Sequence, residues 1–474
     1  MSLSEDFLDD DNSMSYDEKE LQEKIRICKE FINNGQTISN LELLEDTIEM
    51  CVDFDYVEEG LFLVDELLNI APYNSEAWQF KGILLNNMFL FEEAYPCFEK
   101  AISLNPNDVE SFINKSISED NLGLFDEAYK SLKRASELEP NNEEIFYNLG
   151  LLFEKKENWD NAIEYFNKAL EIDPNYIEAL YEIGFCKENL NQLEDALEIY
   201  DRYLEVDPNS YTGWYNKGIV YLRLENFAAA INCFELSVAL NDVFTSSWFN
   251  LGYAFSQLKK MKEALESYNK ALEIDPNDET IYYNIGKIYE EEGAYQLAIK
   301  NYSEAIKLDA SYYEAFLARG YCYDMVGKYK LALKDFNIAI TLTSDSEEAW
   351  FAKADLEYSI GKLQESIQSY KEIVKINPNN FDVWFRMAEA YTEMGLWLDA
   401  IEAYENCIKI NPENANCFYG RAKIHFLLNR TSDAINDLKK AFSLDPQIRN
   451  KFIQDYPEVK SSKLFVKLID ENKN

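Results

Sequence analysis

Apolar and small residues recur along this chain with a period of 34 residues. Within each 34-residue stretch, positions 4, 8 and 11 fall at helical spacing, and positions 20, 24 and 27 repeat that spacing further along. Apolar residues at i, i+4 and i+7 form one face of an α-helix. Each stretch therefore predicts two helices, called helix A and helix B below, and every position is counted from the start of its own stretch.

Three residue types keep this register. Proline occupies position 32 in most stretches and predicts the end of helix B, and a following Asn or Asp can cap the next helix A. Small residues at positions 8 and 20 allow close approach of the two helices, and large residues at positions 4 and 24 fill the space beside them. Eleven stretches begin at 75, 109, 143, 177, 211, 245, 279, 313, 347, 381 and 415, and a degenerate one begins at Leu41.

One stretch shows the whole pattern: Trp248-Phe-Asn-Leu-Gly-Tyr-Ala-Phe255, then Ala264, Tyr268, Ala271 and Pro276. It resembles the tetratricopeptide repeat, in which W-x2-L-G-x2-Y is followed by A-x3-F, A and P over 34 residues. The resemblance covers residues 41–448. It implies an all-α fold, a right-handed superhelical solenoid of stacked antiparallel helix pairs, because one pair cannot bury its apolar face alone.

The ends of the chain depart from the repeat. We expect an acidic, disordered N-terminal tail at 1–16 and an N-terminal capping helix at 17–40. The degenerate repeat follows at 41–74, and the eleven recognisable repeats occupy 75–448. Capping helices and a tail are expected at 449–474.

Charge narrows the choice of partner. The chain carries 87 Asp and Glu against 45 Lys and Arg, a net charge of −42. A nucleic acid partner is disfavoured because phosphates require a basic footprint, and an anionic membrane surface is disfavoured for the same reason. No secretory signal and no stretch of 18 apolar residues is present, so neither secretion nor membrane insertion is expected. Eight dispersed cysteines without a CxxC pair suggest reduced thiols and a cytoplasmic location.

Residues suited to catalysis are scarce. The one histidine, His425, stands at position 11, where other repeats have Tyr or Phe, and is interpreted as a packing substitute. Acidic pairs such as Glu290–Glu291 recur on helix surfaces and are interpreted as solvated. Cys97 and Cys233 share position 23, which favours packing over reactivity. Nucleotide-binding and hydrolase motifs are absent. We therefore expect no enzyme, and no catalytic, cofactor-binding or metal-binding residue.

Positions 2, 5, 9 and 12 form a second face of helix A, called the helix A stripe below. In tetratricopeptide proteins, the resemblance implies, this stripe lines a concave groove that holds partner peptides. Position 2 is mostly acidic. The predicted groove residues are the aromatic residues of position 5 and the asparagines of position 6: Tyr147, Tyr181, Tyr215, Phe249, Tyr283, Phe351, Phe385 and Tyr419, with Asn148, Asn216, Asn250 and Asn284.

Aromatic faces, amides and carboxylates together suit an extended partner segment with apolar and basic side chains. Three simpler interpretations stay open. The aromatic residues could pad the contact between adjacent helices A, the asparagines could bond within their own helix, and the acids could suit a helix N-terminus. Repeats that clamp acidic chaperone tails carry Lys or Arg at position 5 and Asn at position 9. Neither occurs here, so that role is not expected.

The first hypothesis is thus a non-enzymatic scaffold that binds another protein along this groove. One alternative is structural self-assembly, suggested by two weak repeats with Ser116 and Glu119, and with Ala354, Glu357 and Ser366. The high negative charge opposes that alternative at low salt. Another alternative is a regulatory or adaptor subunit of a separate enzyme.

Overall fold

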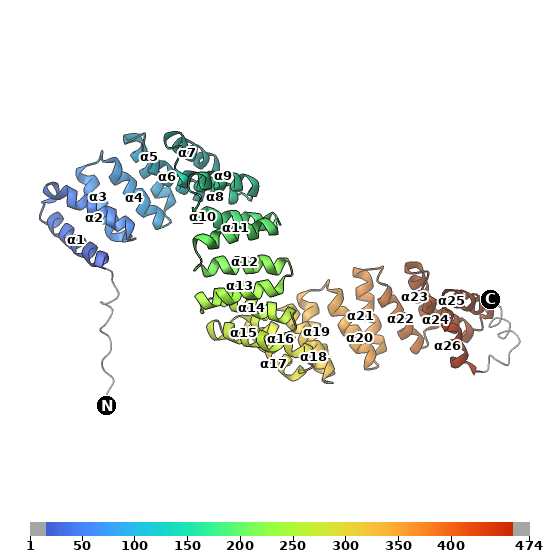
Figure 1. The fold of residues 1–474 in the computed structure, drawn as a ribbon. Coiled ribbons are helices and arrows are strands. Elements are labelled where there is room, and N and C mark those ends of the chain that lie inside the picture. Colours follow the sequence, from blue (N-terminus) through green and yellow to red (C-terminus); the bar gives the residue numbers. More distant parts are fainter. Residues whose placement is uncertain (1–15, 458–474) are drawn as a thin grey trace, which may run out of the picture. The chain divides into compact units, whose positions relative to one another are not determined.

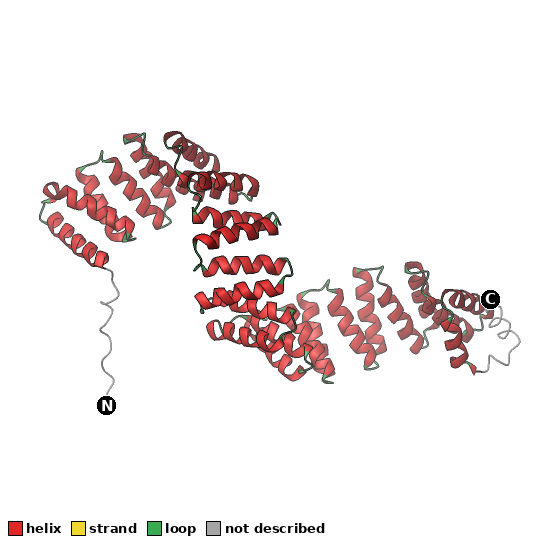
Figure 2. Cartoon of the chain, in the orientation of Figure 1, coloured by secondary structure: helices red, strands yellow, loops and turns green. Residues whose placement is uncertain are grey.

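The computed structural model describes residues 16–457, which form helices joined by short turns without any strand (Figure 2). This confirms the predicted all-α class. The predicted acidic tail lies outside the described residues except for Tyr16, and so does the part of the predicted C-terminal segment beyond residue 457. The helices fall into two compact units, Met1–Asp242 and Val243–Asn474, which are described one at a time.

In the first unit, consecutive helices run antiparallel and side by side (Figure 1). It begins with α1 (Tyr16–Asn33), the short η1 (Thr37–Asn40), α2 (Leu41–Asp53) and α3 (Val57–Ile70). The helices A that follow are α4 (Ser75–Asn87), α6 (Val109–Asn121), α8 (Glu143–Glu154), α10 (Ile177–Asn189) and α12 (Tyr211–Arg223). The helices B are α5 (Phe91–Leu104), α7 (Phe125–Leu138), α9 (Trp159–Ile172), α11 (Leu193–Val206) and α13 (Phe227–Leu240).

The second unit has the same plan (Figure 1). Its helices A are α14 (Thr245–Gln257), α16 (Glu279–Glu291), α18 (Tyr313–Met325), α20 (Glu347–Ser359), α22 (Phe381–Glu393) and α24 (Ala415–Leu427). Its helices B are α15 (Met261–Ile274), α17 (Tyr295–Leu308), α19 (Tyr329–Leu342), α21 (Leu363–Ile376), α23 (Trp397–Ile410) and α25 (Thr431–Leu444). Helix α26 (Gln447–Asp455) packs Phe452 against Phe442 and Tyr419 at the end of the unit.

Helix boundaries follow from the turn residues. The residue at position 34, two after the proline, caps many helices A: the side chains of Asn74, Ser210 and Ser346 accept hydrogen bonds from backbone N–H groups of the first turn. The indole N–H of Trp78 donates to the Pro72 carbonyl at 3.0 Å, and Trp214, Trp350 and Trp384 make the same bond in their repeats. Position 4 thus fixes the turn between repeats.

The turn from helix A to helix B requires a left-handed backbone at position 15. All twelve repeats have positive φ there, including the degenerate one, at Asp55. Glycine holds this position in five repeats, and asparagine in two. These residues tolerate the left-handed conformation, which costs other residues about 1 kcal/mol.

Close packing within each pair depends on the small residue at position 8. A Cβ added to Gly286 would lie 2.6 Å from the Tyr302 ring, and one added to Gly150 would lie 2.3 Å from the Phe166 ring. Those rings occupy position 24 of helix B and are fully buried. The predicted fit of a large residue at position 24 against a small one at position 8 is therefore confirmed.

Candidate functional site

The position-5 aromatic side chains of the helix A stripe are only half-exposed, because they pack on rings of helix B. The Tyr283 and Tyr302 ring centroids are 5.6 Å apart, and those of Phe249 and Tyr268 are also 5.6 Å apart. The same contact with position 24 is made by Tyr147, Tyr215, Phe351 and Phe385. Their rings thus pad the contact between helix A and helix B of one repeat, whereas the simpler interpretation placed them between adjacent helices A. Their contact with a partner stays a prediction.

Two position-5 residues have different surroundings. Tyr181 packs on Tyr203, one turn further along helix B, with centroids 5.9 Å apart. Tyr419 is buried, lies against Phe452 of α26, and donates a 2.6 Å hydrogen bond to Asp455. Because α26 already covers Tyr419, its ring presents little surface to a partner.

The predicted asparagines are partly used by their own helices. The Nδ2 atoms of Asn148, Asn250 and Asn284 donate to the backbone carbonyl four residues earlier, at 2.8–2.9 Å. Asn216 occupies the same position of α12 and is half-buried. A partner backbone would therefore meet amides that are already oriented by the helix.

The carboxylates of position 2 form no ion pair with any residue between 16 and 457. In the part of the chain that the structure describes, no ion pair reaches Glu110, Glu144 or Glu178 in the first unit, nor Glu314, Glu348 or Asp382 in the second. Burial raises the pKa of Glu144, and the charges of Glu110 and Glu143 raise it further. In the second unit, burial and then Glu314, Glu290 and Glu348 raise the pKa of Tyr283. Aromatic and acidic side chains therefore share this face, and the negative charges of the carboxylates repel one another.

Two carboxyl groups meet on adjacent helices of the first unit. Glu154 at position 12 of α8 and Glu182 at position 6 of α10 are hydrogen-bonded to each other. Burial, followed by the neighbouring Glu182, raises the pKa of Glu154 to about 7. The pair therefore holds a shared proton at a pH where isolated carboxyls are ionised.

In the second unit, two clefts lie on the helix A stripe. The larger has a volume of about 550 Å³ and is lined by residues at positions 9, 12 and 13 of α16 and α18 and by the start of α17: Lys287, Glu290, Glu291, Tyr321, Asp324, Met325 and Tyr295. The smaller, about 220 Å³, is lined by Tyr358, Phe385, Glu389, Thr392, Glu393, Tyr404, Asn416, Tyr419, Gly420, Lys423 and Lys451. The smaller cleft includes two of the predicted groove residues, Phe385 and Tyr419.

Sequence reasoning placed positions 9 and 12 on the stripe but named no groove residue there, and it interpreted Glu290 and Glu291, at positions 12 and 13, as solvated surface acids. These positions supply the open side chains of the larger cleft, among them Met325, which is 63% exposed. The groove prediction relied on the aromatic residues of position 5, and most of their rings pack against helix B.

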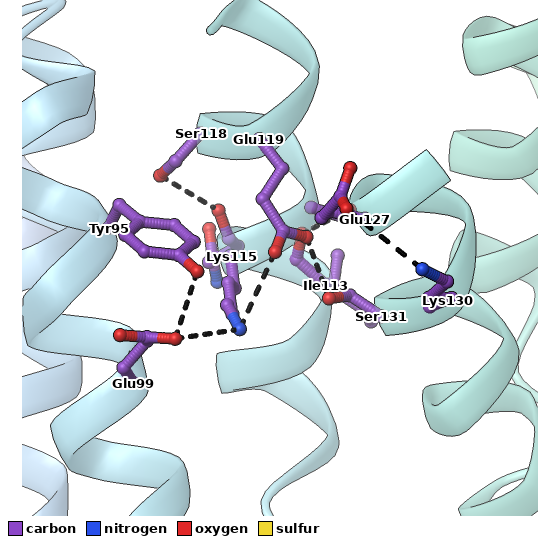
Figure 3. Close-up of polar contacts among 11 residues, drawn as sticks. Tyr95, Glu99, Ile113, Lys115, Ser118, Glu119, Glu127, Lys130 and Ser131 are labelled. Atoms are coloured by element: carbon purple, nitrogen blue, oxygen red, sulfur yellow. Dashed lines mark hydrogen bonds and ion pairs between the residues drawn. The ribbon is translucent and has the colours of Figure 1, made fainter. Parts of the chain in front are cut away.

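In the two weak repeats, the residues that depart from the repeat pattern make polar contacts inside the repeat. Glu119 replaces the usual aromatic residue at position 11, is buried, and accepts a 2.7 Å hydrogen bond from Ser131 (Figure 3). Lys115 lies 3.4 Å from the Glu119 carboxylate and 3.6 Å from Glu99 of the preceding helix B. Glu357 repeats the arrangement with Ser369 and Lys353. These residues face inward, so they do not form the contact surface that motivated self-assembly.

The residues considered for catalysis are packed within repeats. His425 is buried and lies 3.7 Å from Asp437, which Arg421 binds through two hydrogen bonds. Burial is the main cause that raises the pKa of Cys97 and of Cys233 to about 11, which keeps both thiols protonated. Within residues 16–457, no three metal-binding side chains gather at one point. None of the helices described there is long and apolar enough to cross a membrane.

Solved structures resemble parts of this chain. A crystal structure of MamA is 27% identical and covers 34% of this chain and 95% of its own, with a TM-score of 0.33. YrrB, described as a TPR protein with an unusual peptide-binding site, is 27% identical and covers 40% and 98%, with a TM-score of 0.36. The C-terminal part of a TPR repeat-containing protein from Cytophaga hutchinsonii is 16% identical and covers 50% and 97%, with a TM-score of 0.46. No curated protein sequence matches this chain.

Family models match most of the repeats. Models described as TPR repeat match residues 121–157, 252–293 and 354–395. Four models are described as tetratricopeptide repeat. The first matches residues 143–176 and 381–414, the second 165–198 and the third 187–242. The fourth matches 75–108, 279–312 and 415–448. Together these matches span well over half of the chain. The chain belongs to the tetratricopeptide repeat family, whose repeats serve as protein–protein interaction scaffolds.

Proposed function

We propose that this protein is a non-enzymatic scaffold whose helix A stripe binds an extended segment of another protein, one that carries apolar and basic side chains. The observation that supports this most is the set of position-2 carboxylates, which lack cations among the described residues and lie beside half-exposed aromatic rings. The eight thiols, all buried and unpaired in the structure, suit the reducing cytoplasm as its place of action.

Electrostatics favours a basic ligand. Glu314 and Glu348 both raise the pKa of Tyr283, so their charges act on the same face as its ring. A lysine or arginine placed between these carboxylates relieves their repulsion and can also lie against an aromatic face. An acidic segment would add to the repulsion.

The larger cleft offers room for an apolar side chain. Tyr321 and Met325 present apolar surface there, and Asp324 lies beside them. Burial and then Asp355 raise the pKa of Asp324, and no ion pair reaches this carboxyl from any residue between 16 and 457. An apolar residue with a basic neighbour would satisfy both features of the cleft.

The test is affinity capture from native lysate with matched charge reversals. Glu314→Lys with Glu348→Lys changes the stripe of the second unit at two exposed positions. Glu266→Lys with Glu402→Lys makes the same charge change at position 22 of two helices B, where both side chains are exposed. The proposal expects a protein captured by the native chain and by the helix B variant, and lost with the stripe variant. Equal capture by both variants would contradict it.

A further inference from the structure

The turn between α4 and α5 carries an unusual residue at position 15. Phe89 has φ of 60°, in the left-handed region, where a bulky side chain is strained. Glycine or asparagine occupies the same position in seven other repeats. The Phe89 side chain is 77% exposed, so the burial of its ring offsets little of the backbone strain.

Its neighbours extend the apolar surface. Met88 and Leu90 are 41% and 37% exposed, which makes this A–B turn apolar at all three of its residues. The ring of Phe89 lies edge-on to Phe91, with centroids 6.1 Å apart. We call Met88, Phe89 and Leu90 the turn patch.

The preceding A–B turn lies beside the turn patch. Asn87, next to Met88, donates a 3.1 Å hydrogen bond to Asp55, the position-15 residue of that turn. Phe54 in the same turn is also partly exposed. Two neighbouring A–B turns thus each carry an exposed aromatic residue, Phe54 in one and Phe89 in the other.

Exposed carboxylates adjoin this surface in the same two turns. Glu92 and Glu93, in the first turn of α5, are exposed, as are Asp53 and Asp55. Neither Glu92 nor Glu93 forms an ion pair with any residue between 16 and 457. An apolar centre with an acidic border is complementary to apolar side chains flanked by lysine or arginine.

We propose that the turn patch is a second docking surface, separate from the helix A stripe, for a partner protein that presents apolar side chains flanked by basic ones. The acidic border opposes an anionic membrane surface as the occupant. The net charge of −42 opposes a second copy of this chain. A strained and exposed phenylalanine without a folding benefit is the kind of outlier that marks an interaction site.

The substitution Phe89→Gly separates binding from folding. Glycine relieves the left-handed backbone, so the variant should unfold at a higher denaturant concentration than the native chain. Glu157→Gly is the matched control, because Glu157 occupies position 15 of another repeat of the same unit with φ of 56°. Both variants should be stabilised, but only Phe89→Gly removes the exposed ring.

The probe is a display library of random 12-residue peptides, selected on the full chain after depletion on the Phe89→Gly variant. We expect enriched peptides with an aromatic residue or leucine flanked by Lys or Arg. Each peptide should bind the native chain and the Glu157→Gly variant with the same affinity. It should bind the Phe89→Gly variant at least tenfold more weakly. Their affinity should fall as salt rises.

Several results would overturn the proposal. The first is that depletion on Phe89→Gly leaves no enriched peptide, and the second is enrichment of acidic or uncharged peptides. Sedimentation of the native chain as a Phe89-dependent dimer would assign the patch to a second copy. Phe89-dependent binding to phosphatidylserine vesicles would assign it to a membrane. Loss of stability in Phe89→Gly would show that the ring serves the fold.

Discussion

The Tyr302 hydroxyl donates a 2.5 Å hydrogen bond to the Glu290 carboxylate. The two residues hold positions 24 and 12 of one repeat, so the bond ties the core ring of helix B to the helix A stripe. Tyr200 donates to Glu188 in the same way, at 2.6 Å. This pairing fixes certain stripe carboxylates from within the core, while Glu154 and Asp324 face a phenylalanine at position 24 and lack this bond.

Tyr302→Phe should therefore lower the free energy of unfolding by about 2 kcal/mol, because a hydrogen bond to a charged group is lost. Tyr370→Phe is the control: the Tyr370 hydroxyl is buried without a hydrogen-bond partner among the described residues, and its removal should be neutral or stabilising. Urea unfolding followed by tryptophan fluorescence measures both. Equal effects would show that the Tyr302–Glu290 bond contributes nothing.

Gly286→Ala should lower the free energy of unfolding by about 2 kcal/mol or more, since the added methyl collides with the Tyr302 ring and overpacks the core. The chain itself suggests the rescue. Ser116 and Ala422 hold position 8 in repeats where position 24 is Leu132 or Leu438, although Ala354 and Ala388 stand in repeats with Tyr370 and Tyr404 at position 24. Adding Tyr302→Leu to Gly286→Ala should recover stability relative to Gly286→Ala alone. A double-mutant cycle with purely additive effects would contradict this steric account.

The Glu154–Glu182 pair predicts a local pH dependence. The folded pKa of Glu154, about 7, exceeds the ordinary value of 4.5, so the folded state holds a proton that the unfolded state releases. The resulting stability is full below pH 4.5 and is lost as pH rises through 7. Because Glu154 is only half-buried, we expect a contribution on the order of 1 kcal/mol after solvent screening.

Glu154→Gln should flatten this dependence, since glutamine keeps a hydrogen bond to Glu182 without a second charge. Amide hydrogen exchange of α8 and α10, expressed relative to unstructured peptides, should show native protection that falls between pH 5 and 8. Protection in the variant should change less over that interval. Identical pH profiles for the native chain and the variant would show that the Glu154–Glu182 pair does not cause the pH dependence of protection.

The repeat register predicted the helix pairs because the small residue at position 8 and the large one at position 24 are steric requirements that leave a mark in every copy. Gly286 and Tyr302 illustrate this. Glu119 could not be placed in the same way, because the repeat pattern expects an aromatic residue at position 11. Its carboxylate is tolerated through two polar partners, Lys115 four residues earlier on the same helix and Ser131 on helix B. The left-handed backbone at Phe89 could not be predicted either, because no single residue type occupies position 15 in all repeats.

The candidate site was harder to predict than the fold. The larger cleft is lined at positions 9, 12 and 13 of helix A, and the first two of these belong to the helix A stripe. The degree of burial of each ring could not be known from spacing, because Tyr283 has the same periodicity whether or not it packs on Tyr302. Met325 and Tyr321 were overlooked because positions 9 and 13 vary between repeats.

The most direct test of the proposed function is photo-crosslinking at one exposed residue on each face of the second unit. Benzoylphenylalanine replaces Met325 in the cleft of the helix A stripe, or Leu297 on helix B of the preceding repeat, which is also exposed. The proposal predicts a cross-linked partner segment from position 325, rich in apolar and basic residues, and none from position 297. Cross-linking from position 297 alone, or to an acidic segment, would contradict it.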